Sequence, residues 1–166
     1  MITVRQSVSN DPHDLAPRMR LADVEELEAS SGMTPLEGLV TAYEVSQLCL
    51  TAEIDGEVVA MFGVAEDDEV SRHIGLHYGN IWYLGSPESV SDARLFMRES
   101  RAWLDALGKR FNGLGNVVDA RNTKHVRWIK AMGFTFIDTI TDYGPEGHTF
   151  LRFYKTCEGL ECATPH

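Results

Sequence analysis

Residues 119–134 read DARNTKHVRWIKAMGF, and this stretch carries the start and end signals of one short helix. Asn122 is typical of an N-cap, because its side-chain oxygen can accept a backbone N–H of the first turn. Apolar residues follow at helical spacing, namely Val126, Ile129 and Met132, and Gly133 is typical of a helix end. The preceding run GNVVDA (115–120) predicts a short buried strand. The stretch therefore predicts a strand followed by a helix.

The flanking segments predict further strands and one long helix. Upstream, NIWYL (80–84) predicts a strand, and Ser89 or Ser91 is expected to open a helix that ends near Leu107. Gly108 is placed where a C-cap belongs. The apolar positions of this helix, expected to be buried against the sheet, are Phe96, Trp103, Leu104 and Leu107. Downstream, FTFIDTI and HTFLRFY predict a closing hairpin around residues 143–147.

The N-terminal half contains two strong local signals. Thr34, Pro35 and Glu37 form the pattern of a capping box with proline at the first helical position, so a helix is expected from there. Asp55-Gly56 separates LCLTAEI from EVVAMFGV and favours a two-residue type I′ hairpin. A first strand is expected at residues 2–8 and a helix at residues 13–30. The acidic residues 66–69 are expected to form a loop.

The order of these elements indicates an α+β fold in a single domain. Strands followed by a strand–helix–strand unit predict a mixed sheet of six or seven strands with about four flanking helices. The length of 166 residues suits one domain, which we place at residues 1–156, followed by a tail at 157–166.

Composition and charge exclude several classes of function. The formal net charge of −10 argues against sequence-independent nucleic-acid binding, which depends on Lys and Arg. No apolar run approaches the roughly 20 residues of a membrane span, and no signal peptide is evident. The acidic clusters 25–28 and 66–69 indicate solvated surfaces, or surfaces that attract a basic partner. We expect no metal site, because His73 and His77, and likewise Cys157 and Cys162, lack further ligands.

The element order and the stretch 119–134 resemble the C-terminal half of the GNAT (N-acetyltransferase) superfamily. In that family a short strand leads to Asn, then to a helix that ends in Lys-x-x-Gly-Phe; the matching residues are Asn122, Lys130, Gly133 and Phe134. The order of elements is similar along almost the whole chain, and the residues are similar from about 79 to 154. The block from IWYLGS onward also resembles small GNAT-like proteins of short-tailed bacteriophages, some described as internal virion proteins and others as acetyltransferases.

This resemblance implies that strands 80–84 and 116–120 are adjacent, parallel and splayed, with a cleft at their C-terminal ends. It also implies an acetyl-CoA site at this splay and at the loop after strand 80–84. In the family, pantetheine bonds an exposed strand edge and a glycine-rich loop, R/Q-x-x-G-x-G/A, cradles the pyrophosphate. Here the loop reads LGSPESVSDA (84–93), with one glycine, a proline and two acids, so we expect weak or no CoA binding. The residues that the resemblance assigns to the cofactor are Trp82, Leu84, Gly85, Ser86, Arg94, Asn122 and Trp128. If the cleft is empty of CoA, Trp82, Tyr83 and Trp128 are expected to fill it.

The sequence does not contain all the catalytic residues that the resemblance implies. The family's general-acid Tyr is replaced by Ile129, which cannot donate a proton. Tyr83, Asp119 and His125 are the remaining candidates for proton transfer to or from a substrate amine.

Three functions therefore stay open. The first is an acyl-CoA-dependent N-acyltransferase that acts on a small-molecule or protein amine. The second is a catalytically silent scaffold with a phage or host protein partner, for example in virion assembly. The third is a small-ligand binding module. The expected location is the cytoplasm of a host cell or a virion. Fold alone does not decide among these functions.

Overall fold

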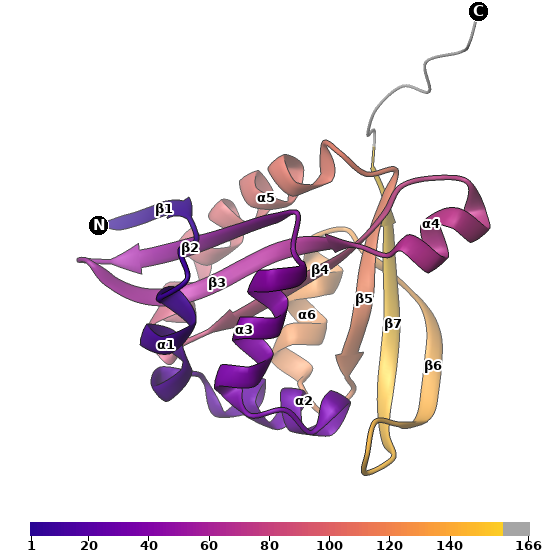
Figure 1. Ribbon diagram of the computed structural model, residues 1–166, viewed down its shortest axis with the longest axis horizontal. Helices are drawn as coiled ribbons and strands as arrows, with labels where there is room; N and C mark the ends of the chain where they lie inside the picture. Colours follow the sequence, from indigo (N-terminus) through magenta and orange to yellow (C-terminus); the bar gives the residue numbers. More distant parts are fainter. Residues whose placement is uncertain (158–166) are drawn as a thin grey trace, which may run out of the picture.

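The computed structural model describes residues 1–157 and shows one seven-stranded sheet covered by helices on both faces (Figure 1). The strands are β1 (Ile2–Gln6), β2 (Leu48–Ile54), β3 (Glu57–Glu66), β4 (Tyr78–Gly85), β5 (Gly113–Asp119), β6 (Thr135–Tyr143) and β7 (His148–Thr156). The α-helices are α1 (Asp11–Leu15), α2 (Leu21–Ser31), α3 (Pro35–Val45), α4 (Asp68–Ile74), α5 (Ala93–Gly108) and α6 (Thr123–Ala131). Two short 3₁₀ helices, η1 (Ala16–Arg18) and η2 (Pro87–Val90), complete the described chain.

The strand order is β1-β2-β3-β4-β5-β7-β6, and the contact between β4 and β5 is its one parallel pairing. That pairing covers only three residue pairs, from Tyr78–Gly113 to Asn80–Gly115. Beyond them the strands diverge, and Figure 1 shows β1–β4 at a wide angle to β5–β7. The mixed sheet and its adjacent, parallel, splayed strands confirm the prediction, and the sheet has the larger of the two expected strand numbers.

Helices form two layers around the sheet. The side chains of α1 and α3 pack with Val58, Met61 and Trp82 in one apolar cluster. Those of α5 and α6 pack in a second, larger cluster with Leu50, Phe62 and other residues of β2–β5. Because successive side chains of a strand alternate between faces, Trp82 and Tyr83 of β4 belong to different clusters. No helix in residues 1–157 combines the length and the apolar composition that crossing a membrane requires.

Local sequence signals are confirmed where their partners lie within a few residues. Thr34 and Glu37 form both bonds of the capping box at the start of α3. Asp55 and Gly56 both have positive φ angles, of 52° and 86°, as a type I′ turn requires. Asn122 caps α6 by accepting the backbone N–H of His125.

Several predicted boundaries are wrong. The single helix expected at 13–30 is divided into α1, η1 and α2, with extended backbone at Met19 and Arg20 between η1 and α2. The long helix begins after Asp92, whose carboxylate accepts two N–H groups and so caps it in place of either serine. Gly108 belongs to the helix and is not its cap. The acidic loop contains helix α4, which Asp67 caps and which ends at Gly75 with a positive φ.

The prediction that α5 buries its aromatic side chains against the sheet holds only in part. Leu104 and Leu107 are buried, but Phe96 and Trp103 are half-buried. A cavity lies along these residues, and part of its lining comes from the small side chains of Ala52 and Ala60. The face of α5 that carries the two rings is therefore not closed against the strands.

The predicted tail falls almost entirely on residues 158–166, outside the described part of the chain, and so does Cys162. Cys157 directly follows β7, and its backbone N–H donates to the carbonyl of Asn112. His77, named above with His73, bonds Glu66 at 2.6 Å on the exposed side of the molecule.

Candidate active site at the splay between β4 and β5

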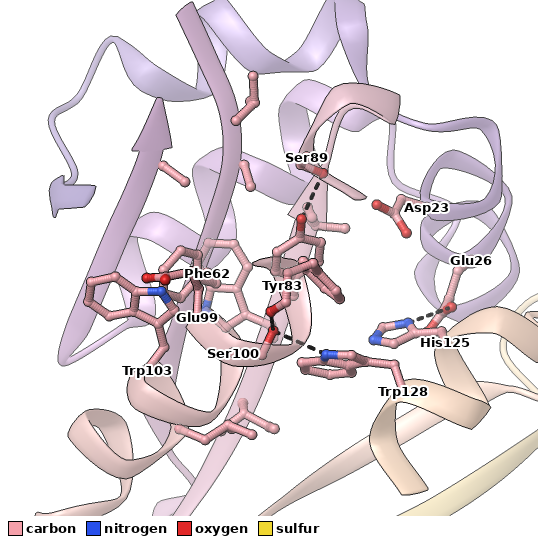
Figure 2. Close-up of a pocket in the computed structure, with 18 of the residues that line it drawn as sticks. Asp23, Glu26, Phe62, Tyr83, Ser89, Glu99, Ser100, Trp103, His125 and Trp128 are labelled. Atoms are coloured by element: carbon pink, nitrogen blue, oxygen red, sulfur yellow. Dashed lines mark hydrogen bonds and ion pairs between the residues drawn. The ribbon is translucent and has the colours of Figure 1, made fainter. Parts of the chain in front are cut away.

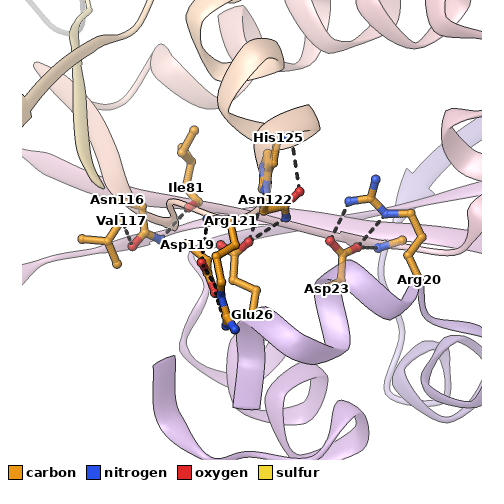
Figure 3. Close-up of polar contacts among 11 residues, drawn as sticks. Arg20, Asp23, Glu26, Ile81, Asn116, Val117, Asp119, Arg121, Asn122 and His125 are labelled. Atoms are coloured by element: carbon orange, nitrogen blue, oxygen red, sulfur yellow. Dashed lines mark hydrogen bonds and ion pairs between the residues drawn. The ribbon is translucent and has the colours of Figure 1, made fainter. Parts of the chain in front are cut away.

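The splay opens at Ile81 and Asn116, directly after the last ladder pair. The side-chain amide of Asn116 donates to the carbonyl oxygen of Ile81 at 2.7 Å, and its oxygen accepts the N–H of Val117 (Figure 3). The Ile81 carbonyl therefore points toward β5. Because this direction repeats at every second residue of a strand, the N–H and C=O of Tyr83 also face the opening. The splay thus exposes a strand edge to which an amide-containing ligand can bond.

An elongated cavity of about 320 Å³ runs through the splay (Figure 2). On one side of the sheet it reaches Asp23 and Glu26 of α2, and on the other it continues beneath α5. Aromatic rings follow one another along it, with centroid distances of 5.6 Å for Trp103–Phe62, 6.2 Å for Phe62–Tyr83 and 6.3 Å for Tyr83–Trp128. Aromatic and aliphatic side chains predominate in the cavity lining, and carboxylates line it both at the α2 end and along α5.

A second cleft, of about 310 Å³, lies between α5 and α6. Its lining includes Arg20, Lys124 and Arg127, and no carboxylate is among the described residues that form it. It shares Tyr83, Phe96, His125 and Trp128 with the inner cavity, so these side chains form the wall between the two. The chain has a net charge of −10, so most of its surface repels anions. The outer cleft, which has cationic side chains and no acids in its described lining, is suited to bind an anionic group.

The end of β4 is already hydrogen-bonded to helix α2. The backbone N–H of Gly85 donates to Asp23 at 3.0 Å, and the Gly85 carbonyl accepts the N–H of Arg20 at 2.8 Å. Arg20 also forms a two-point pair with Asp23, with distances of 2.6 and 3.1 Å. The N–H of Ser86 donates to Val59. Neither backbone N–H of Gly85 or Ser86 is available for a phosphate unless these bonds open.

A polar cluster of Glu26, Asn122 and His125 lies at the α2 end of the inner cavity. The amide of Asn122 donates to the Glu26 carboxylate at 2.8 Å, and the same oxygen lies 3.7 Å from Nδ1 of His125 (Figure 3). Within the described residues this Nδ1 atom is buried and has no hydrogen-bond partner. The cluster can therefore bind a donor, such as an amine, between a carboxylate and an imidazole nitrogen.

The three predicted catalytic residues do not meet in one place. His125 lines both the cavity and the cleft. Tyr83 lies between them, where burial raises its pKa well above the usual value, so its hydroxyl stays protonated and bonds Ser89 at 2.7 Å. Asp119 is buried elsewhere: burial alone would raise its pKa, but the bonds from Arg121 lower it. Asp119 lies outside both cavity linings and holds the turn before α6.

The predicted cofactor residues also lie in different parts of the structure. Trp128 lies in the shared wall and donates to Ser100 at 3.1 Å. All three side chains expected to fill an empty cleft belong to residues that line the inner cavity. Tyr83 and Trp128 lie together in this wall, whereas Trp82 packs in the cluster on the opposite face of the sheet and bonds Ser46. Leu84 shares that face with Trp82. Arg94 is exposed on the first turn of α5, beside Ala93 of the cleft, and its role stays a prediction.

Sequence reasoning missed the contribution of α2. Arg20, Asp23 and Glu26 lie at the splay, whereas the acidic cluster 25–28 was expected to be a solvated helix face. Glu25 and Glu28 are exposed, as expected, but Glu26 is turned toward α6. The spacing of Asp23 and Glu26, which places them three residues apart on one side of α2, is the signal that could have shown this.

No protein-family model matches the sequence, and no curated protein is significantly similar to it. Solved structures are similar in fold. A GNAT-superfamily phosphinothricin acetyltransferase from Sinorhizobium meliloti, in complex with acetyl-CoA, matches with a TM-score of 0.68 and 13% identity over 99% of this chain and 92% of that chain. A protein from Salmonella typhimurium that is described as a proposed acetyltransferase with its cofactor acetyl-CoA gives a TM-score of 0.67 and 14% identity over 100% of this chain and 98% of that chain.

The ribosomal-protein-S18-alanine N-acetyltransferase from Escherichia coli matches over the whole of both chains, with a TM-score of 0.67 and 11% identity. Identities this low show the arrangement of the backbone and leave the chemistry open. The chain has the GNAT acetyltransferase fold.

Proposed function

We propose that this protein is an acyl-CoA-dependent N-acyltransferase that binds acyl-CoA with its phosphates in the cleft between α5 and α6. The observation that carries the proposal is that an acid-free cleft with cationic side chains shares a wall with an apolar cavity at an exposed strand edge. This arrangement fits a ligand with anionic, amide-containing and apolar parts in that order. Two of the similar structures contain acetyl-CoA, which has these parts.

The polar cluster beyond the splay supports amine acylation. When bound, acyl-CoA supplies a thioester carbonyl that an amine can attack. Glu26 is placed to hold the cationic or neutral amine, and Nδ1 of His125 to take the proton that the amine loses. In the transfer, the bond between the acyl carbon and sulfur breaks, a bond from that carbon to the amine nitrogen forms, and the sulfur leaves as a thiolate. The Tyr83 hydroxyl belongs to the same wall and donates to Ser89 at 2.7 Å, so it can protonate that sulfur only after it leaves this bond.

Reversing the charge of the cleft tests the binding site. Lys124→Glu with Arg127→Glu is expected to weaken CoA binding at least tenfold, about 1.4 kcal/mol, because both side chains line the cleft. The matched control is Lys130→Glu, which reverses an exposed charge of α6 outside the cleft lining. Isothermal titration calorimetry at low salt measures all three proteins. Equal affinities for the double variant and the control would place the phosphates elsewhere.

A silent scaffold is the second candidate, and the bonds at the end of β4 favour it. Asp23 occupies the Gly85 N–H that a phosphate would use, and Tyr83, Phe96 and Trp128 pack together across the route into the cavity. A scaffold of this kind would act through its surface, for example in virion assembly as the likeness to phage proteins implies. Absence of any heat on titration with acetyl-CoA and with free CoA would favour the scaffold over the enzyme.

A further inference from the structure

The inner cavity extends far beyond the place where a thioester carbonyl would lie. Its lining continues from Tyr83 of β4 across β3 and β2 to Val4 of β1. Neighbouring strands are ~4.8 Å apart, so β1 lies ~14 Å from β4 across the sheet. An acetyl group reaches only the first part of that distance.

We propose that this extension is an acyl-chain pocket, and that the protein transfers an uncharged medium-chain acyl group in preference to acetyl. The inference rests on the proposed N-acyltransferase function and names the acyl group that it uses. The floor is formed by small side chains, Ala52 and Ala60, and the roof by Leu95 and Trp103 of α5. Aliphatic and aromatic side chains therefore form most of the lining of the extension, which Glu99 and Ser100 of α5 also join.

Size and packing support the assignment. Protein interiors are close-packed and contain few voids larger than a water molecule, so a continuous apolar space is typical of a ligand site. An apolar cavity of ~150 Å³ already holds benzene, and the whole inner cavity, of which the extension is one part, has about 320 Å³. The half-buried rings of Phe96 and Trp103 are consistent with this reading, because a bound chain would cover surface that the protein itself leaves uncovered.

The charges along the extension exclude acyl groups that end in a carboxylate. Glu99 lines the extension, is half-buried and pairs with Arg98 at 3.1 Å. Asp92 lines the cavity as well. A succinyl group would bring a further carboxylate against these two, whereas an alkyl chain meets mainly apolar side chains.

The test measures dissociation constants of acetyl-, octanoyl- and succinyl-CoA by calorimetry with the full chain. Octanoyl-CoA is expected to bind at least tenfold more tightly than either of the others, because each additional buried methylene favours binding. Equal or tighter binding of acetyl-CoA would overturn the acyl-chain pocket and leave the proposed function standing. If no thioester binds, the proposed function fails, and the inference fails with it.

Substitutions that fill the pocket test whether the pocket causes the preference for octanoyl-CoA. Ala52→Leu and Ala60→Leu are each expected to remove the tenfold advantage of octanoyl-CoA while leaving acetyl-CoA affinity within twofold of the wild type. Ala106→Leu is the matched control, since Ala106 is exposed on α5 and does not line the cavity. Thermal unfolding shows which variants fold. If neither filling variant folds, the affinities of the wild-type protein for acetyl- and octanoyl-CoA still test the proposed pocket. Retention of the preference in a folded filling variant would overturn the assignment.

Discussion

Asp11→Ala is expected to lower the free energy of unfolding by about 3 kcal/mol, because it removes a buried carboxylate that accepts four hydrogen bonds, one of them from the buried Thr51. The Asp11 carboxylate is 1% exposed. It accepts two bonds from Arg5, at 2.8 Å each, and further bonds from Thr51 and from the N–H of Val8. These contacts tie the start of α1 to β1 and β2. Urea denaturation followed by circular dichroism measures the loss.

Asp14→Ala is the matched control, because Asp14 belongs to the same short helix but is exposed and bonds only Asn10 among the described contacts. Its expected cost is below about 0.5 kcal/mol, as for most surface substitutions. A similar loss for the two variants would contradict the role assigned to the Asp11 network.

The same network gives the stability a defined pH dependence. Burial alone would raise the pKa of Asp11, but the bonds from Arg5, Thr51 and Val8 outweigh burial and lower it. A carboxylate whose pKa is lower in the folded state stabilises the fold above its unfolded pKa, and that contribution is lost as the pH falls through the folded pKa. The stability difference between wild type and Asp11→Asn is therefore expected to be constant above about pH 5 and to shrink at lower pH.

His125→Gln is expected to lower kcat for amine acylation by about 100-fold, the lower range for loss of a general base. The reason is geometric: Nδ1 is buried, has no bond within the described residues, and lies 3.7 Å from the Glu26 carboxylate. Glu26→Gln is expected mainly to raise KM for the amine, since it removes the charge that holds the substrate. Release of CoA thiol, followed with a thiol reagent, measures both parameters.

Glu25→Gln provides the control for Glu26, as the neighbouring carboxylate is exposed and points away from the cavity. Its kcat and KM should match the wild type. An active His125→Gln protein with unchanged kcat would show that another group takes the proton. Thermal unfolding of each variant separates a loss of catalysis from a loss of folded protein.

Elements with strong local signals could be placed from the sequence. The boundary errors arose where several residues could cap the same helix or where a helix has no apolar stripe. Thr34 and Glu37 bond each other three residues apart, so their pattern is sufficient by itself. Before α5, Ser89, Ser91 and Asp92 could each have capped the helix. Only the path of the chain through η2 selected Asp92. Helix α4 was missed because, on an exposed segment, it lacks an apolar stripe and depends on its caps.

In the candidate site, too, some residues could be found from local sequence signals and others could not. His125 and Trp128 were found because they belong to the quoted stretch 119–134, whose strand and helix are local features. Glu26 bonds Asn122 from 96 positions away, and Asp23 bonds Gly85 from 62 positions away. No local pattern specifies such pairs, because they depend on how α2 docks against the ends of β4 and β5.

The sequence by itself determined the order of the elements, the caps of α3 and α6 and the hairpin at Asp55-Gly56, and its resemblance to the GNAT superfamily indicated the adjacency of β4 and β5. These features follow from bonds and periodicities that act within a few residues, or from the short list of ways in which such elements connect. Tertiary structure alone decided which acids of α2 reach the splay, that Asp23 takes the Gly85 N–H, and that a cavity lies beneath α5. Those outcomes depend on the summed packing of side chains from several elements, which no single segment encodes.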